Sequence, residues 1–572
     1  MAKFKTDLRD IYFNLFDYLN VTNGTEYQAQ DLKDIIEQYS KFIESEVWPT
    51  RETGDREGVK LTPNGVVVPE CFKNALSQYY QNGWFALGKP EEIGGMPAPH
   101  TVSFVCTSIL CGANMGFSMY PGLSEGAMNV INQIGSDTQK NIYIPAMMEG
   151  RWGGTMCLTE PGAGSDVGAC KTMATPKGDG TYSIKGVKIF ISSGENNLYE
   201  NIIHLVLART PGAPEGTKGL SLFIVPRINH DASGVLGTAN GVKCTKIEEK
   251  MGIHGSATCE LTFGADNECV GFLIGKEFEG MQNMFIMMNE ARLLVAIHGE
   301  SQASLAYQLA EQYAKERVQF GTEIINHMDV KRLLIKSRAK SRALRALNLY
   351  TANLLDQAKV KHELESMVAL LVPVCKSYCS DEGFNICVDA VQIHGGYGYC
   401  SEYGIEQFVR DAKIATIYEG TNAIQGIDFV MRKILRDEGS TFKALVEQIA
   451  NSIKTHARAE WKEEQQLMAD SLKEAGSILE RMAGWAKDKK MDQILCQSSD
   501  FLNFCGHLVC SWLLMEQAAK ASLLLGSADG DDKFFLQTKI DDFKFICRHV
   551  LSTNAGLAKR FSMSEEIPGM VV

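Results

Sequence analysis

The sequence lacks the residue spacings that hold a zinc ion or a disulfide framework. Its 16 cysteines are spread over 572 residues, without a CxxC pair or a zinc-like Cys/His spacing. The close pairs Cys106/Cys111, Cys375/Cys379 and Cys505/Cys510 have spacings that suit one face of a helix. We therefore expect reduced, mostly buried thiols and no metal site.

The sequence also lacks a signal peptide and an uninterrupted membrane-spanning segment. Residues 1–20 carry three acids and no long apolar core. The most apolar stretch, residues 501–525, is interrupted by His507, Glu516 and Lys520. This pattern predicts a buried bundle helix, no transmembrane segment and a cytoplasmic protein.

An excess of positive charge is missing as well. The chain has 57 Lys+Arg and 69 Asp+Glu, a net charge of -12, which excludes a generic nucleic-acid binder. Its 45% hydrophobic and 22% charged residues are typical of a globular protein, and its length allows about three to five domains. The net charge does not exclude a local basic pocket for a small anionic ligand.

The order of predicted elements is helical, then β-rich, then helical to the end. Apolar residues recur at helical spacing over 31–48, while Gly- and Pro-bearing loops are expected at 51–69 and 87–100. This order does not match alternating βαβ units, so a doubly wound sheet is disfavoured. Strands are predicted at 181–192, with a hairpin turn at Lys185-Gly186, and at 201–209 and 219–226; long helical runs follow at 301–320, 330–355 and 367–394. We expect domains at 1–152, 153–275, 276–437 and 438–572.

Residues 159–168, TEPGAGSDVG, form the densest Gly/Ser segment. Backbone N–H groups in such a turn can cradle phosphates, but an ordinary turn has the same composition. A dinucleotide fingerprint would require glycine at Val167, and no Gly-Lys-Ser/Thr completes a P-loop. The segment alone therefore leaves both interpretations open.

A second Gly cluster, QIHGGYGY at 392–399, precedes RDAKI at 410–414 and IYEGTN at 417–422. Glu419 between Tyr418 and Gly420 has the setting of a positioned base, but for this segment taken alone a solvated turn carboxylate is the favoured interpretation. The lone histidines His254 and His394 are expected to be hydrogen-bonded structural residues.

Taken in order, these segments resemble the acyl-CoA dehydrogenase flavoenzymes over residues 30–436. The matching segments are TEPGAGSD (159–166), KIFIS (188–192), ERVQFG (316–321), QIHGGYGY (392–399), RDAKI (410–414) and IYEGTN (417–422). Four further segments resemble the long bacterial form of the 3-methylmercaptopropionyl-CoA dehydrogenase type: MYPGLSEGA (119–127), residues 201–226, KMGIHGSATC (250–259) and MMNEARL (287–293).

The resemblance implies a mainly α fold with a central β-domain, a helical bundle and an additional C-terminal helical domain. It implies oxidation of an acyl-CoA to the trans-2-enoyl-CoA, with FAD taking two electrons and passing them to electron-transferring flavoprotein. Glu419 is then the base that removes the α-proton. Exclusion of water should raise its pKa. An acyl-CoA oxidase and a nonredox acyl-CoA- or flavin-binding protein are the alternatives.

The resemblance also implies a substrate site and a second candidate base. Some relatives carry the base immediately before the arginine that corresponds to Arg292, where this chain has Ala291. Glu290 is one residue away, about 100° around a helix, and is the alternative base. The substrate-binding residues implied are Ser165, Asn289, Arg292, Tyr418 and Gly420.

The implied FAD site draws on residues from two subunits. Phe190 stands where tryptophan is usual and Ser192 where threonine is usual, and both replacements keep a ring or a hydroxyl. The implied FAD-binding residues of the same subunit are Met156, Leu158, Thr159, Ser165, Phe190, Ser192 and Thr421, and those that reach the FAD of a neighbouring subunit are Arg317, Phe320, Gln392 and Gly396. We therefore expect a homodimer, with a tetramer as the alternative.

The Lys/Arg-rich stretch 331–345 has two interpretations. It could attract the phosphates of CoA or an acidic partner, and a solvated helical face is the favoured alternative.

Overall fold

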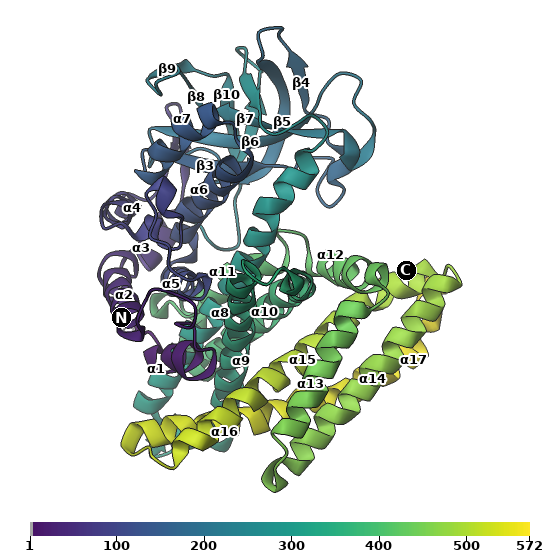
Figure 1. Cartoon of the computed structure of the whole chain (residues 1–572). Helices are drawn as coiled ribbons and strands as arrows, with labels where there is room; N and C mark the ends of the chain where they lie inside the picture. Colours follow the sequence, from purple (N-terminus) through teal and green to yellow (C-terminus); the bar gives the residue numbers. More distant parts are fainter. Residues whose placement is uncertain (1–3, 572) are drawn as a thin grey trace. The chain divides into compact units, whose positions relative to one another are not determined.

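The computed structural model describes residues 4–571, and the side chains of Asn289, Ser564 and Glu565 lie outside that description. The chain forms two compact units (Figure 1). Unit 1 comprises residues 1–37, 99–112 and 292–572, and unit 2 comprises residues 38–98 and 113–291. The divisions fall within or beside three helices: α2 (Ala29–Phe42), α5 (His100–Ala113) and α8 (Gly280–Glu316).

Unit 2 is built on an eight-stranded sheet with the order β10-β11-β5-β12-β7-β6-β3. Strand β4 pairs with both β5 and β6, so five strands close into a ring. Most pairs are antiparallel, and β3 runs parallel to β6. The strands of the sheet are β3 (Trp152–Cys157), β4 (Met173–Pro176), β5 (Tyr182–Ser192), β6 (Asn201–Arg209), β7 (Leu220–Pro226), β10 (Val242–Ile247), β11 (Thr258–Phe263) and β12 (Val270–Leu273); two hairpins add β1 (Lys60–Thr62) with β2 (Gly65–Val67) and β8 (Ile228–His230) with β9 (Leu236–Ala239).

The predicted strands at 181–192, 201–209 and 219–226 are confirmed as β5, β6 and β7. The predicted hairpin turn at Lys185-Gly186 is wrong, because both residues continue β5. Gly186 pairs with Phe263 of β11, and Lys185 pairs with Met173 of β4. Strands on either side of β5 hold the Lys185-Gly186 step extended, which local turn propensity alone does not reveal.

The helices of unit 2 are α3 (Thr50–Glu57), α4 (Cys71–Gln81), α6 (Met115–Ile134) and α7 (Asp137–Met148). The loop predicted at 51–69 is therefore partly wrong, since α3 and the β1–β2 hairpin occupy most of it. Helix α7 begins with a capping box in which the Ser136 and Gln139 side chains each bond the other's backbone N–H.

Unit 1 is a helical assembly around long helices. Helices α9 and α10 pack against each other, and α15 packs against α14 and α16 (Figure 1). The helices are α1 (Leu8–Tyr12), α9 (Met328–Ala358), α10 (Glu365–His394), α11 (Glu406–Lys413), α12 (Asn422–Ile427), α13 (Ser440–Thr455), α14 (Lys462–Lys487), α15 (Met491–Leu525), α16 (Gly530–His549) and α17 (Asn554–Met563), with a short β13 (Val318–Gln319)–β14 (Thr322–Glu323) hairpin.

The apolar stretch at 501–525 forms the last 25 of the 35 residues of α15, and it is a helix as predicted. By length and composition α15 is the one helix among the described residues that could cross a membrane, but 67% of its apolar window is buried within the protein. That burial is typical of the core helix of a bundle. The cysteines behave as expected too, because all 16 are free thiols and most are buried.

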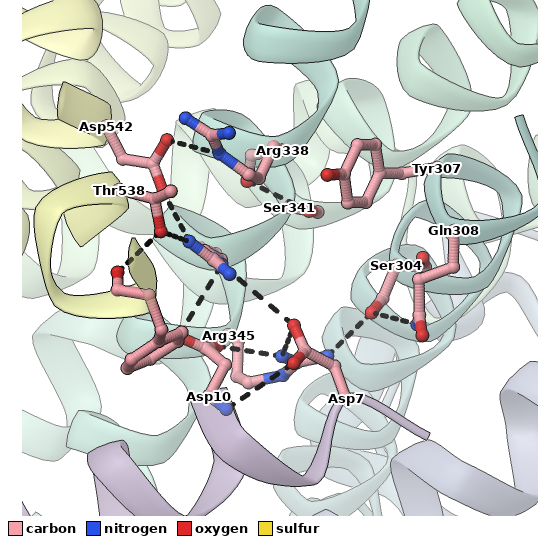
Figure 2. Close-up of polar contacts among 12 residues, drawn as sticks. Asp7, Asp10, Ser304, Tyr307, Gln308, Arg338, Ser341, Arg345, Thr538 and Asp542 are labelled. Atoms are coloured by element: carbon pink, nitrogen blue, oxygen red, sulfur yellow. Dashed lines mark hydrogen bonds and ion pairs between the residues drawn. The ribbon is translucent and has the colours of Figure 1, made fainter. Parts of the chain in front are cut away.

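The favoured interpretation of residues 331–345 as a solvated face is wrong. These residues lie in α9, where Lys336 pairs with Asp389 at 2.7 Å and Lys340 pairs with Glu382. On the same helix, Arg338 and Arg342 contact Asp542 of α16 at 2.8 and 2.9 Å, and Arg345 contacts Asp10 of α1 at 2.8 Å. Figure 2 shows Arg338 facing Asp542, and Arg345 beside Asp7 and Asp10. The stretch is therefore a buried ion-pair network that ties the N-terminal segment to the C-terminal helices of unit 1.

Candidate active site

The segment that carries Glu419 is a tight turn between α11 and α12. Glu419 adopts φ 55° and Gly420 φ 81°, and the left-handed region is strained for a residue with a side chain. Thr421 caps α12, since its hydroxyl accepts a hydrogen bond from the Ile424 N–H at 3.4 Å. The Gln425 side chain donates to the Glu419 carbonyl at 3.0 Å. The turn is thus held in place by the helix that follows it.

Tyr418 is fixed by a histidine of α8. Its hydroxyl and Nδ1 of His298 form a 2.5 Å hydrogen bond, and His298 is 2% exposed. Burial lowers the pKa of His298 to about 3, so the imidazole is neutral and its unprotonated nitrogen can accept a hydrogen bond from the phenol. Nε2 of the same ring is buried without a partner in the described residues.

Arg292 of α8 forms a buried ion pair with Asp428 at 3.0 Å. Asp428 begins a short π-helix (Asp428–Ile434) after α12, and such irregular turns are frequent at functional sites. Nε of Arg292 is buried without a hydrogen-bond partner in the described part of the chain. The predicted contact of Arg292 with CoA stays a prediction.

Glu419 itself is half-buried and sits in an environment that weakens its acidity. Burial raises the pKa of its carboxyl to about 6, against the opposing positive charges of Arg292 and Lys376. A carboxylate with this pKa is a better base near neutral pH than an exposed one. Among the predicted site residues, Glu419 therefore has the chemistry of a general base.

The alternative base, Glu290, has different surroundings. Its side chain is exposed, and it accepts a hydrogen bond from Asn129 at 3.0 Å. It therefore lacks the burial that strengthens Glu419 as a base. The neighbouring Asn289 was predicted to bind substrate, and its side chain lies outside the described residues.

In unit 2, the predicted flavin residues lie on neighbouring backbone segments. The carbonyl of Thr159 accepts a hydrogen bond from the Ile189 N–H at 2.9 Å, which places the segment after β3 alongside β5. Beneath them, the fully buried Lys188 donates to the Leu158 carbonyl and to Glu160, both at 2.9 Å. This ion pair fixes the start of the 159–168 turn, and the sequence thus brings Met156, Leu158, Thr159, Phe190 and Ser192 to one region of the sheet.

This region offers an exposed aromatic side chain and an open Gly-rich turn. Phe190 is 60% exposed although it lies in a strand, and it has a strained φ of 59°. Gly162 and Gly164 in the exposed turn have open space where a Cβ would lie, and Ser165 beside them is exposed. An exposed aromatic face next to an open Gly-rich turn provides the stacking surface and N–H donors that a flavin nucleotide requires.

In unit 1, the residues predicted to reach a neighbouring subunit gather at one exposed surface. Arg317 lies over the ring of Tyr397 at 5.2 Å, next to Gly396 in the turn that follows α10. Phe320 is 96% exposed, and Gln392 and Gly396 are exposed as well. His394 donates to the Ala390 carbonyl at 2.7 Å and stacks on Tyr313, as expected of a structural histidine.

Three residues of the Glu419 surroundings did not stand out in the sequence: His298, Lys376 and Asp428. His298 and Lys376 each interrupt an apolar helical run, which is the signal that could have found them. A single polar residue in such a run is more often a satisfied core residue, so only the spatial neighbourhood of Glu419 identifies these two.

The family models match these features along nearly the whole chain. The N-terminal domain model of acyl-CoA dehydrogenase matches residues 29–151, the middle domain model 155–265 and the C-terminal domain model 279–435. A further model, acetyl-CoA dehydrogenase C-terminal like, matches residues 445–566. The chain belongs to the acyl-CoA dehydrogenase family, a class of flavin-dependent oxidoreductases that use FAD, and has that family's fold with the extra C-terminal domain.

Individual relatives agree with this assignment. The chain is 39% identical to the 3-methylmercaptopropionyl-CoA dehydrogenase of Ruegeria pomeroyi, covering 92% of this chain and 91% of the relative. It is 36% identical to the broad-specificity linear acyl-CoA dehydrogenase FadE5 of Mycobacterium tuberculosis, covering 96% of both. The acyl-CoA dehydrogenase of Bacillus anthracis, solved in complex with FAD, shares the fold with a TM-score of 0.77 at 22% identity, over 95% of this chain and 89% of that one.

Proposed function

We propose that this protein catalyses the α,β-dehydrogenation of an acyl-CoA to the trans-2-enoyl-CoA, with Glu419 as the base. The observation that carries the proposal is the environment of Glu419, a carboxyl whose pKa is raised to about 6 in a strained, anchored turn. The family assignment supports the same reaction.

The protein residues bind the substrate, orient it and move one proton. The Glu419 carboxylate removes the α-proton of the thioester, and its backbone N–H donates a hydrogen bond to the thioester oxygen as negative charge develops there. Tyr418, Gly420, Ser165, Asn289 and Arg292 are the proposed substrate contacts. When bound, FAD supplies the two-electron acceptor for the hydrogen that leaves the β-carbon.

The cofactor residues divide into a stacking set and a polar set. Met156, Leu158 and Phe190 offer apolar surface for the ring, while Thr159, Ser165, Ser192 and Thr421 offer hydroxyl groups. The exposed Phe190 and the open glycines of the 159–168 turn support this assignment.

The proposed substrates are straight-chain acyl-CoAs and 3-methylmercaptopropionyl-CoA, and the proposed electron acceptor is electron-transferring flavoprotein. The relatives from Ruegeria and Mycobacterium support the acyl-CoA class. A solved structure published as the electron transferring flavoprotein of Acidaminococcus fermentans, 29% identical over 71% of this chain with a TM-score of 0.59, supports the proposed acceptor. We place the enzyme in the bacterial cytoplasm.

We further propose domain boundaries at 1–152, 153–275, 276–437 and 438–572. The ranges of the four family models support them. In this arrangement Glu419 belongs to the third domain, and the fourth is the additional helical domain.

The exposed surface around Phe320 supports an obligatory homodimer. Arg317, Phe320, Gln392 and Gly396 are proposed to complete the FAD site of the second subunit. Phe320 is 96% exposed, Val318 50% and Tyr399 88%, and several exposed apolar or aromatic side chains in these segments are typical of an interaction surface. Light scattering on the purified protein should therefore give a mass near twice 63.1 kDa. A stable monomer that retains FAD and activity would contradict the shared site, and a fourfold mass would indicate the tetramer.

The raised pKa of Glu419 predicts a pH dependence for the reaction. Because the base must be ionised, the rate of anaerobic flavin bleaching at limiting acyl-CoA should rise as the pH increases through about 6. Stopped-flow absorbance measures the bleaching rate between about pH 5 and 9. The ionic strength is held constant, because salt screens interactions between charges. A profile that is flat through this interval would contradict Glu419 as the base.

A further inference from the structure

Lys376 is a cation placed inside the helical bundle, close to the proposed base. It lies in α10, its side chain is 0% exposed, and its Nζ donates to Oδ1 of Asn422 at 2.8 Å. An ammonium group out of contact with water is costly unless negative charge lies near it. Asp381 and Glu419 are the acidic groups that stabilise its charged form.

The partner of Lys376, Asn422, stands at the end of the turn that carries Glu419. This turn, residues 417–422, is called the catalytic turn below. Asn422 is the first residue of α12 and stands three positions after Glu419. Its amide nitrogen donates to the Ser380 hydroxyl at 3.0 Å and to the Ser377 carbonyl at 3.3 Å, so its side chain is clamped on α10. The Lys376 ammonium donates to the amide oxygen of Asn422, so both the nitrogen and the oxygen of this side chain are bonded to α10. These bonds are called the clamp below.

The charged and titratable groups around Glu419 come from three elements. Arg292 of α8 has its charge countered by Asp428 at 3.0 Å, and Arg432 also approaches Asp428 at 3.5 Å. Helix α10 contributes Lys376 and Asp381. Tyr418 and His298 are neutral, because burial raises the pKa of the phenol and lowers that of the imidazole. Arg292 and Lys376 are thus the cations that act on Glu419.

We infer that Lys376 is a positioning residue for this reaction: its buried charge favours the ionised form of Glu419, and its hydrogen bond to Asn422 holds the catalytic turn on α10. The inference rests on the proposed role of Glu419 as the base.

The pKa values of Lys376 and Glu419 lie close together, so the charge states of the two groups are linked. Burial lowers the pKa of Lys376 to about 7, against Asp381 and Glu419, whereas burial raises the pKa of Glu419 to about 6. Between these values both groups are charged and stabilise each other. Below that interval Lys376 opposes protonation of the base, and above it Glu419 is already ionised.

The direct test is a titration of Glu419 in the FAD-loaded enzyme without substrate. Infrared difference spectra follow the carbonyl band of its protonated carboxyl, which is identified by its loss in Glu419→Gln. In Lys376→Met the midpoint should move up by about one pH unit, because an opposing cation is gone. Lys376→Gln removes the charge but keeps an N–H donor, so it should move the midpoint equally. Lys443→Met, on the exposed face of α13, is the matched control and should leave it unchanged.

The bleaching rate as a function of pH distinguishes loss of the Lys376 charge from loss of the hydrogen bonds that hold Asn422. Both variants should bleach about fivefold more slowly than wild type near pH 6 and recover toward wild type by about pH 9. Ser380→Ala weakens the clamp without changing charge and should leave the pH profile in place. A uniform loss at every pH, with an unshifted Glu419 titration, would overturn the inference. If no acyl-CoA bleaches the wild type, the proposed function fails, and the infrared titration still decides whether Lys376 acts on Glu419.

Discussion

Glu419→Gln is expected to lose reductive bleaching by about 10²- to 10⁴-fold, the contribution typical of a general base. The substitution keeps the size and hydrogen-bonding reach of the side chain but removes the group that accepts the α-proton. FAD content and acyl-CoA binding should be retained, because the turn is held by Thr421 and Gln425 rather than by the carboxylate. Single-turnover absorbance and equilibrium binding of acyl-CoA measure the two properties separately.

Glu290→Gln is the control that distinguishes the two candidate bases. Glu290 is exposed, so its variant should bleach at nearly the wild-type rate. The opposite pattern, with Glu419→Gln active and Glu290→Gln inactive, would move the base to α8. Loss of FAD from Glu419→Gln would instead show that the carboxylate holds the site together.

The second large effect is expected at the buried ion-pair network of unit 1. Asp10 is 0% exposed and accepts hydrogen bonds from Lys539 at 2.7 Å and from Arg345 at 2.8 Å. Figure 2 shows Asp10 beside Arg345. Asp10→Asn leaves these cations buried without their carboxylate, which should lower the free energy of unfolding by about 3–5 kcal/mol. Denaturant unfolding of the FAD-loaded protein, followed by circular dichroism, measures the loss.

Two variants and a pH series test the physical cause. Asp531→Asn, on the exposed first turn of α16, should be neutral. Adding Lys539→Met to Asp10→Asn should recover part of the loss, since one unpaired charge is removed. The neighbouring cations hold the pKa of Asp10 below its ordinary value near 3.9, so the stabilisation is present above that pH and is lost as the pH falls further. Equal stability of Asp10→Asn and wild type would mean that the network contributes nothing net.

Sequence patterns predicted the elements whose signals are local. The β-branched and apolar runs of β5, β6 and β7 and the long apolar face of α15 identify themselves within one window of the chain. The motif order likewise leads to Glu419, because the EGTN turn is contiguous. The turn prediction at Lys185-Gly186 was wrong because composition favours a turn there, whereas the neighbouring strands β11 and β4 hold the backbone extended.

What the sequence could not supply were the contacts between distant segments. Arg345 meets Asp10 across 335 positions, and Arg338 meets Asp542 across 204, so a helical run of Lys and Arg gives no sign that its face is buried. The same holds for His298, which meets Tyr418 across 120 positions. The residues that anchor the turn carrying Glu419 were therefore visible only in the structure, where α8 and α10 lie beside that turn.

The most direct test of the proposed function is anaerobic titration of the purified yellow protein with a panel of acyl-CoAs. The panel runs from 3-methylmercaptopropionyl-CoA and butyryl-CoA to palmitoyl-CoA, and flavin absorbance is recorded before and after air is admitted. We predict bleaching by a subset of the panel, which identifies the chain-length preference, with slow recovery in air and fast recovery with electron-transferring flavoprotein. Rapid recovery in air alone would make the protein an oxidase. No bleaching by any acyl-CoA, from protein that holds FAD, would contradict the dehydrogenase function and the role of Glu419.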